Sequence, residues 1–465
     1  MKMGKRSVQV VFFVAILGAL LVTGSLQTTG RLGSVAQAQG DNWTTETARR
    51  LGIRLLETRN AGGPPAYPVA PGDLLFFTNS GTEYGAQNTK NSVVVINAKT
   101  KKPIAISDLD SFYTEDYGSH GIGVSPDGKY IYLPNLDGIG SPGKRTPNST
   151  LILDARTLKI NQVIVSGGTP HHVKVFRDPA GKQRVFVEDW TWIGSTMNGK
   201  SLYVLDHTDN NKVVAGMLPS EIHGGTYAGF TTPDGKYLYY SVPPPSRTEL
   251  MPKIQGWLAK IDMETWKVVQ SIPMKRYPLW TVFTKDGKWA WVTNSAEEAV
   301  LKIQRGTSPR ERDKVVAEVP TGTGPYGMRM SIDDKELWVA DKGELGPRNG
   351  ATLTIIDAEK NEVRRTIQTN CIRNDHIILS PDGQEMWATC NASYEIVVLD
   401  AKTHEIKTRI PMPNQGDSHG GVFVSYARNS RGGIAAEVVS DQNGLQGSAL
   451  DAYLKGTPWV APGAR

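Results

Sequence analysis

A short pattern recurs along this chain and constrains its fold more than any other feature. Each copy has an apolar strand, a turn built on Asp-Gly or its equivalent, and a second strand rich in Tyr and Trp. Alternating polarity on both sides of such a turn predicts a β-hairpin. The six copies are HGIGVSPDGKYIYLPN from His120, HVKVFRDPAGKQRVFVEDW from His172, AGFTTPDGKYLYYSVP from Ala228, WTVFTKDGKWAWVTNS from Trp280, YGMRMSIDDKELWVADKG from Tyr326 and HIILSPDGQEMWATCN from His376.

A second hairpin follows each copy, so every unit contains four strands, which is the size of a β-propeller blade. The chain also begins with an incomplete unit, LLFFTNS and SVVVINAKTKKPIAI, and ends with a single strand, HGGVFVSY. Together these pieces make one more blade. We therefore predict an all-β, seven-bladed β-propeller closed by pairing of its N- and C-terminal strands, with about 50 residues per blade.

The N-terminal part of the chain predicts export. Three basic residues precede an apolar run at residues 8–22, and an Ala-Gln-Ala sequence ends at residue 38, so residues 1–38 resemble a cleaved signal peptide. The alternative is a retained membrane anchor, for which the apolar run is short. We expect the propeller at residues 39–427 and a C-terminal tail at residues 428–465, packed on the ring or mobile. The mature protein is then periplasmic or secreted, with no membrane span after signal cleavage.

The charge of the chain argues against a nucleic-acid partner. The formal net charge is +6, but the Lys and Arg residues are scattered through turns and solvent-facing strand positions and form no basic stripe. The surplus is ordinary surface charge, or it steers a small anion toward the protein.

The chain has only two cysteines, Cys371 and Cys390. An exported compartment permits a disulfide between them. The bond would flank the loop that holds Asp375 and His376. The alternative is a pair of buried free thiols.

Three of the repeated segments resemble a known propeller repeat. VSPDGKYIYLPN, FTKDGKWAWVTN and LSPDGQEMWATCN look like the YVTN repeat, and the likeness covers nearly all of the mature chain. The resemblance implies a propeller. That family includes cell-surface proteins, lactonase-like enzymes and the propellers of several periplasmic oxidoreductases, so the repeat specifies the fold and not the activity.

Histidines are concentrated just before the innermost strands, which line the central channel of a propeller. Six of the eight histidines lie there and are expected to converge on one face. Neutral imidazoles that converge without a CxxC pair favour copper or zinc, and iron is an option if Asp375 joins as a carboxylate ligand. We predict a metal site, with copper suiting an exported redox protein best. Its candidate ligands are His120, His171, His172, His223, His376 and His419.

Other side chains are candidates for catalysis on the same face. Glu188 follows the second strand of its blade and is expected beside the site with Asp375. Lys90, near the end of the first-blade loop, is a candidate for binding an anionic substrate, although an exposed structural lysine is the simpler alternative. Two positions of the ring carry Trp280 and Tyr326 instead of histidine. This uneven distribution predicts a lopsided pocket with an aromatic wall opposite the histidines.

The positions of the histidines resemble those in the copper-bearing propellers of thiocyanate dehydrogenase and nitrous-oxide reductase. That resemblance implies a copper oxidoreductase acting on a small, anionic substrate. It maps ligands onto the inner loops and an anion-binding role onto Lys90. It also implies an external electron acceptor, because the chain has no Cys-rich copper domain. The positions that match are His120, His171 or His172, His376 and His419.

A second resemblance is to the propeller of nitrite reductases that carries a d-type haem. It implies that inner histidines serve as axial ligand and acid-base groups, and that Arg329, Lys342 and Arg373 bind haem carboxylates. No CxxCH sequence is present, so a covalent c-type haem is not expected.

Two further functions stay open from the sequence. In a non-catalytic binding or surface protein, the long loops would hold a partner and the histidines would be structural. A hydrolase such as a lactonase would need no electron acceptor, but no GxSxG motif is present, which disfavours classical acyl transfer.

Overall fold

The computed structural model describes most of the chain after the expected export signal. It covers residues 43–462 except 82, 87–89, 108, 110–118, 135–148, 167, 191–200, 244–254, 307–310 and 346–347. The chain divides between Ala38 and Gln39, and the expected signal at residues 1–38 lies outside the described residues. Within the described part, no helix combines the length and apolarity that a membrane span needs.

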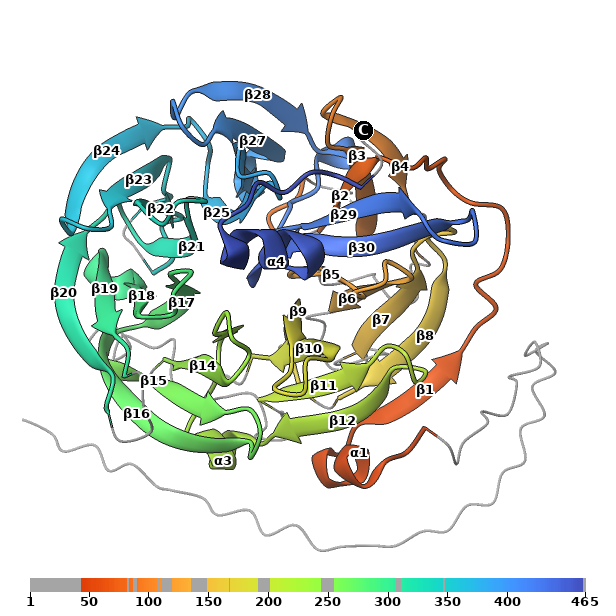
Figure 1. The fold of residues 1–465 in the computed structure, drawn as a ribbon, viewed down its shortest axis with the longest axis horizontal. Helices are drawn as coiled ribbons and strands as arrows, with labels where there is room; N and C mark the ends of the chain where they lie inside the picture. The colour runs from red at the N-terminus through yellow and green to blue at the C-terminus, as the bar shows by residue number, and fades with distance from the viewer. Residues whose placement is uncertain are drawn as a thin grey trace, which may run out of the picture. The chain divides into compact units, whose positions relative to one another are not determined.

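Seven antiparallel sheets succeed one another around a central channel (Figure 1), which confirms the predicted all-β propeller. The first three complete sheets, from the inner strand outward, consist of β5 (Gly123–Val124), β6 (Tyr130–Pro134), β7 (Ser149–Asp154), β8 (Ile160–Val165) and the added β1 (Arg54–Thr58); β9 (Pro170–Arg177), β10 (Gln183–Asp189), β11 (Leu202–Asp206) and β12 (Lys212–Met217); and β13 (Gly229–Thr231), β14 (Tyr237–Val242), β15 (Gln255–Asp262) and β16 (Lys267–Arg276).

The next three sheets follow the same order. They consist of β17 (Pro278–Phe283), β18 (Trp289–Asn294), β19 (Ala299–Gln304) and β20 (Lys314–Pro320); β21 (Pro325–Met330), β22 (Glu336–Asp341), β23 (Thr352–Asp357) and β24 (Glu362–Gln368); and β25 (Asn374–Leu379), β26 (Glu385–Cys390), β27 (Glu395–Asp400) and β28 (Ile406–Pro411). Short helical elements join some of the strands: α1 (Glu46–Leu51), α3 (Pro219–Ile222), η2 (Ser295–Glu297), η3 (Asn391–Ser393) and η4 (Pro413–Gln415).

The repeated turn explains why each copy forms a hairpin. In the first copy the Ser125 hydroxyl donates to Asp127 Oδ1 at 2.7 Å and accepts from the Tyr130 backbone N–H at 2.9 Å. Gly128 then takes a φ of 67°, in the left-handed region that glycine adopts without strain. Asp334, in the Asp-Asp variant of the turn, takes a φ of 59°. The short polar side chains and the glycine therefore encode the reversal locally.

The seventh sheet closes the ring by pairing the two ends of the chain, as predicted. It contains β2 (Leu74–Ser80), β3 (Ser92–Asn97) and β4 (Lys102–Ile106) from the N-terminal part and β29 (Val422–Arg428) from the C-terminal part. β2 and β29 are antiparallel, with Phe76 opposite Phe423. Closure removes the two free sheet edges that an open ring would expose.

The C-terminal segment does more than follow the propeller as a tail. β30 (Ile434–Asp441) and β31 (Gly444–Leu445) extend the closing sheet on the inner side of β29, and α4 (Gly447–Lys455) lies near the centre of the ring (Figure 1). We call β30, β31 and α4 the plug. The plug contacts the inner strands of other blades: Asp441 Oδ2 accepts from the Val175 backbone N–H at 2.7 Å, and the Ser440 hydroxyl donates to the Leu379 carbonyl at 2.7 Å. The boundary expected after residue 427 therefore does not separate two structural units.

Burial decreases from the channel to the rim of the ring. Every residue of β21 and β22 is buried, whereas most of β24 is exposed. Trp291, Trp338 and Trp387 lie on the second strands of successive blades and are fully buried between the sheets. Polar side chains on the inner strands are therefore removed from bulk water, so each needs a partner within the protein or a ligand.

Candidate metal centre

Five histidines meet at one end of the channel. His171 and His172 are on β9, His376 is on β25, and His120 and His419 precede β5 and β29. The ring centroids of His171 and His172 are 3.8 Å apart, those of His120 and His419 4.0 Å, and those of His120 and His171 4.2 Å. His376 lies 5.4 Å from His172. No ring in this cluster belongs to a residue more than 5% exposed. Blades that are far apart in sequence thus bring their imidazoles into direct contact.

Most of these rings have a nitrogen without a partner. His120 Nε2, His171 Nδ1, His172 Nε2 and His376 Nε2 are buried and form no hydrogen bond with the described residues. Leaving a buried polar atom unsatisfied costs about 1–3 kcal/mol. A metal ion would satisfy several such nitrogens at once, because neutral imidazole is a common ligand of transition metals.

The possible ligand atoms fall into overlapping groups in which all atoms lie within 4.8 Å of one another. Three neighbouring histidines form one group, and two further groups add a carboxylate to histidines. The groups are His120, His171 and His172; Glu83, His120 and His419; and Asp375, His376 and His419. Two groups share His120 and two share His419, so the groups form one continuous set of ligand atoms.

The protonation states of four histidines suit ligation. Burial lowers the pKa of His120, His171 and His172 well below the usual value of 6.5. Burial also lowers the pKa of His376 to about 4, although the neighbouring Asp375 carboxylate acts in the opposite direction. These rings are therefore neutral at pH 7 and have lone pairs for a metal ion.

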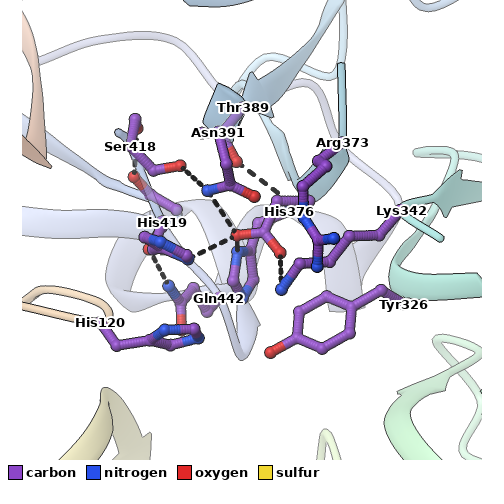
Figure 2. A network of polar contacts seen from close by, with 12 residues as sticks. His120, Tyr326, Lys342, Arg373, His376, Thr389, Asn391, Ser418, His419 and Gln442 are labelled. Atoms are coloured by element: carbon purple, nitrogen blue, oxygen red, sulfur yellow. Dashed lines mark hydrogen bonds and ion pairs between the residues drawn. The ribbon is translucent and has the colours of Figure 1, made fainter. Parts of the chain in front are cut away.

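Asp375 connects the histidines to a buried lysine, and its partners Lys342, His376 and His419 are labelled in Figure 2. Its Oδ2 accepts from His376 Nδ1 at 2.6 Å and lies 2.9 Å from His419 Nδ1, while its Oδ1 lies 2.8 Å from Lys342 Nζ. Burial acts to raise the pKa of Asp375, but His376, Lys342 and His419 outweigh it and hold this pKa well below its ordinary value. The carboxylate is ionised, and it fixes which nitrogen of His376 faces the cluster.

His419 differs from the other rings because it lies between two carboxylates. Its Nε2 is 2.9 Å from Asp417 Oδ2, and its Nδ1 is 2.9 Å from Asp375 Oδ2. Burial acts to lower the pKa of His419, but Asp375 and Asp417 outweigh it and raise this pKa to about 10. Without a metal ion this imidazole is a cation, so a metal that bound it would replace a proton.

Glu188 holds a histidine and a lysine in place. Both of its oxygens accept from Lys174 Nζ at 2.7 Å, and its Oε2 lies 3.2 Å from His172 Nδ1. All three side chains are fully buried. Burial lowers the pKa of Lys174 and raises that of Glu188. Glu188 is therefore buried and does not face open solvent. Its contact with Nδ1 directs His172 Nε2 toward the cluster.

The predicted aromatic wall is confirmed. Trp280 lies 4.7 Å from the ring of His376, and Tyr326 lies 5.2 Å from it. The Tyr326 and Tyr227 hydroxyls share a hydrogen bond of 2.6 Å, and Tyr227 reaches the ring of His171 at 4.8 Å. The wall covers one side of the cluster and excludes water from it.

Two of the predicted site residues lie apart from the cluster. His223 is the exposed residue that ends the short helix α3, with a φ of 66°, because that helix was inserted before β13. It takes part in none of the ligand groups found among the described residues. Lys90 is exposed two residues before β3, whereas the five histidines of the cluster are buried. Both His223 and Lys90 therefore lie outside the buried cluster.

Two carboxylates of the site were not proposed from the sequence. The Glu83 Oε2 atom lies 2.7 Å from His120 Nδ1, and Asp417 contacts His419. Lys342, one of the cations expected on this face, is buried, contacts Asp375, and places Nζ 3.9 Å from the centre of the Tyr326 ring. The signal for Asp417 was its position two residues before His419, whereas Glu83 is near the cluster only because the ring closes.

A disulfide joins Cys371 and Cys390, which decides between the two alternatives that the sequence leaves open. Cys371 lies just before β25, and Cys390 is the last residue of β26. The bond therefore links the loop before Asp375 and His376 to the neighbouring strand. It fixes one of the ligand-bearing inner loops to the blade.

Comparison with known proteins places this fold beside several propellers. A hydrazine synthase subunit beta of Kuenenia stuttgartiensis is 26% identical over 245 residues, which is 50% of this chain and 53% of that protein, so the chain spans about half the length of this relative. A solved chain of Kuenenia stuttgartiensis hydrazine synthase has a TM-score of 0.51 at 20% identity and covers 67% of this chain and 90% of its own.

A dihydro-heme d1 dehydrogenase, NirN, has a TM-score of 0.53 at 18% identity and covers 83% of this chain and 82% of its own. A periplasmic gluconolactonase of Pseudomonas aeruginosa has the same TM-score at 14% identity, over 75% of this chain and 99% of its own. These likenesses show the fold. The family model of the cytochrome D1 heme domain matches residues 116–427, well over half of the chain. The chain therefore belongs to the cytochrome D1 heme domain family.

Proposed function

We propose that this protein is an exported oxidoreductase whose five-histidine cluster binds transition-metal ions, with copper the ion that suits the donor set best. One observation carries the proposal: four buried imidazole nitrogens have no partner among the described residues, and their residues belong to groups of three whose ligand atoms lie within 4.8 Å of one another. Imidazole nitrogen is a favourable ligand for copper, zinc and iron, and the affinity order places copper first. Export is inferred from residues 1–38.

The cluster divides into two candidate metal positions. The first would be held by His120, His171 and His172, and the second by His376 and His419 with a carboxylate beside them. Glu188 and Asp375 hold ring nitrogens on the outer side of the cluster, as the carboxylate partners of metal-bound histidines commonly do. When bound, the metal would supply the redox centre, and electrons would leave through an external acceptor.

The substrate would be small and anionic. The histidines and the aromatic wall are packed against one another, so only a small molecule would fit beside the metal. A buried cation lies beside the cluster at Lys342, whose Nζ is 2.8 Å from Asp375 Oδ1. Burial acts to lower the pKa of Lys342, but Asp375 and Glu344 outweigh it and raise this pKa, so the lysine keeps its charge. Lys342, and not the exposed Lys90, is therefore the proposed source of positive charge for an anion.

Elemental analysis of the purified protein tests this proposal. The wild-type protein, isolated from its native compartment, should contain one or more equivalents of copper, and the His120→Ala/His376→Ala double variant should have lost most of it. His223→Ala is the matched control, because it removes a histidine that lies apart from the cluster, and it should keep the wild-type metal content. Metal-free wild-type protein, or equal metal in all three proteins, would contradict the proposal.

A d-type haem is the second candidate, because the family match favours it. The described residues fit it poorly. The centroids of neighbouring rings lie 3.8–6.4 Å apart, which leaves no gap for a macrocycle between them. One of the cations expected to bind haem carboxylates is also paired within the protein, because Arg373 Nη2 lies 3.1 Å from Glu344 Oε2.

The visible absorption spectrum of the same preparation separates the two candidates. A d-type haem would give strong bands in the red and would be extracted by acidified organic solvent, whereas copper on imidazoles would give only weak absorption there. A preparation with haem and no copper would establish the second candidate. A preparation with neither would leave a propeller that binds partners without catalysis.

A further inference from the structure

A cavity of about 80 Å³ lies at the end of the channel opposite the histidines. The histidines lie at the start of the inner strands, and the cavity is lined by residues at the far ends of those strands, including Thr231, Val282, Arg329 and Leu379. The plug forms the rest of the lining, with Leu450 of α4 among its residues. A cavity needs about 10–15 Å³ by this measure to hold one water, so this one has room for a molecule of several heavy atoms.

One cation in the cavity lining has no carboxylate partner. Arg329 is 7% exposed, its Nη2 donates to the carbonyls of Asp441 and Gln442 at 3.3 and 2.7 Å, and its Nε has no hydrogen-bond partner among the described residues. A guanidinium cannot lose its charge near neutral pH. A buried charge bonded only to neutral carbonyls is poorly compensated, which favours the entry of an anion.

The other charged groups around the cavity are already paired. Arg177 Nη1 lies 3.0 Å from Asp451 Oδ1, so its charge is compensated within the protein. Asp441 is the acidic group nearest to Arg329, but its oxygens accept from backbone N–H groups of Val175 and Asn443. The Asp441 carboxylate attracts the Arg329 guanidinium but does not contact it. Arg329 is therefore the one cation of the described lining that contacts no carboxylate.

The rest of the lining indicates what kind of anion would fit. Val282, Leu379 and Leu450 are apolar, and Phe283, Met330 and Leu445 add further apolar surface. Polar side chains such as Thr231, Ser331 and Gln446 also line the cavity, but its apolar part offers the oxygens of a sulfate or phosphate no hydrogen bonds to replace their hydration. A carboxylate with a short alkyl chain would put its charge on the arginine and its alkyl group on the apolar side.

We propose that this cavity is a second binding site, separate from the histidine cluster, and that it binds a small aliphatic monocarboxylate through Arg329. The plug closes the site from the side of α4, and Arg329 contributes a charge-assisted hydrogen bond to the carboxylate. The site does not depend on whether the histidines bind metal.

Calorimetric titration of the full-length protein with propionate tests the proposal. Binding should be saturable, with one site per chain and a dissociation constant of about 1 mM or lower. Leu450→Trp should abolish it by filling the cavity. Leu454→Trp is the matched control, because Leu454 is exposed on the same helix and is not part of the lining, and it should bind propionate as the wild type does. Arg329→Gln should weaken binding at least about tenfold, or about 1.4 kcal/mol.

Several results would overturn the proposal. Absence of saturable binding by the wild type would do so, and so would equal binding by the Leu450→Trp and Leu454→Trp variants, which would place the anion elsewhere. Tighter binding of sulfate or phosphate than of propionate would refute the assigned class of ligand. The His120→Ala/His376→Ala variant should bind propionate normally, and a loss there would assign the signal to the histidine cluster. The leucine pair keeps the test decisive if Arg329→Gln does not fold.

Discussion

The buried pair of Lys174 and Glu188 gives a quantitative test of the site's architecture. Replacing Lys174 by Met removes the ammonium that both Glu188 oxygens contact at 2.7 Å and leaves the carboxylate fully buried. Removing one partner of a buried ion pair costs about 3–5 kcal/mol, whereas replacing both partners is often close to neutral. We expect Lys174→Met to lower the free energy of unfolding at pH 7 by about 3–5 kcal/mol. The Lys174→Met/Glu188→Gln double variant should lose less than half as much.

The pH dependence of the single variant has a defined sign. Burial already raises the pKa of Glu188, and without Lys174 nothing of opposite charge opposes it. The folded variant then binds a proton more tightly than the unfolded chain, so its stability rises as the pH falls from 7 toward the unfolded-state pKa of this carboxyl group. The deficit relative to wild type should shrink by up to about 1.4 kcal/mol per pH unit.

Guanidinium chloride unfolding, followed by tryptophan fluorescence at pH 7, 6 and 5, measures both effects. The experiment needs a chelator in every sample, because a metal bound only to the folded state would add its own stability. A loss below about 1 kcal/mol for the single variant, or a deficit that does not change with pH, would refute the assignment of a charged, mutually dependent pair.

Three other predictions test the site and the scaffold. Asp375→Asn should weaken metal binding about 10–100-fold because it no longer orients the histidines beside it; competition with a chromophoric chelator measures this, and unchanged affinity would contradict it. Burial raises the pKa of Asp341 to about 7, so the free energy of unfolding of the wild type should fall as the pH rises from about 4 to 7. The Asp341→Asn variant should gain about 2–3 kcal/mol of stability relative to the wild type between pH 5 and pH 8. Unfolding curves of both proteins at these two pH values test this, and a difference in stability that does not change with pH would argue against it. Replacing Cys371 and Cys390 by Ser opens a loop of 19 residues and should cost about 3 kcal/mol; a reductant should then destabilise only the wild type, and equal sensitivity of both proteins would be inconsistent with the bond.

The sequence alone was sufficient for the propeller because the information is local. Each hairpin is encoded by its own alternating strands and its own turn, in which a hydroxyl, an aspartate and a residue with positive φ reverse the chain within a few positions. The closure of the ring could also be predicted by counting strands, since the incomplete first unit and the single last strand together make one blade. The convergence of His120, His171, His172, His376 and His419 followed from the fold, because the start of every inner strand faces the same end of the channel.

The tertiary structure decided which candidates belong to the site. His223 lies a few residues earlier in its repeat than the other histidines, where it ends the short helix α3 and is exposed. Lys90 is also exposed. Three further charged groups reach the cluster. Asp417 lies two residues before His419 and Lys342 follows the second strand of its blade, whereas Glu83 has no local signal and is brought there by closure of the ring.

The plug and Glu188 also show the difference between what the sequence predicts and what the tertiary structure decides. Residues 434–455 have none of the repeated turn signals, and their Gly, Ser and Ala content reads as a tail, yet they complete the inner side of the closing sheet because hydrogen bonds from other blades fix them there. Glu188 was recognised as a residue of the site from its position after a strand. Its pairing with Lys174, and with it the orientation of His172, depends on side chains that meet across β9 and β10. Local sequence thus determined the strands, the turns and the end of the channel that carries chemistry, while contacts between distant blades determined which groups are charged, paired or left with a free nitrogen.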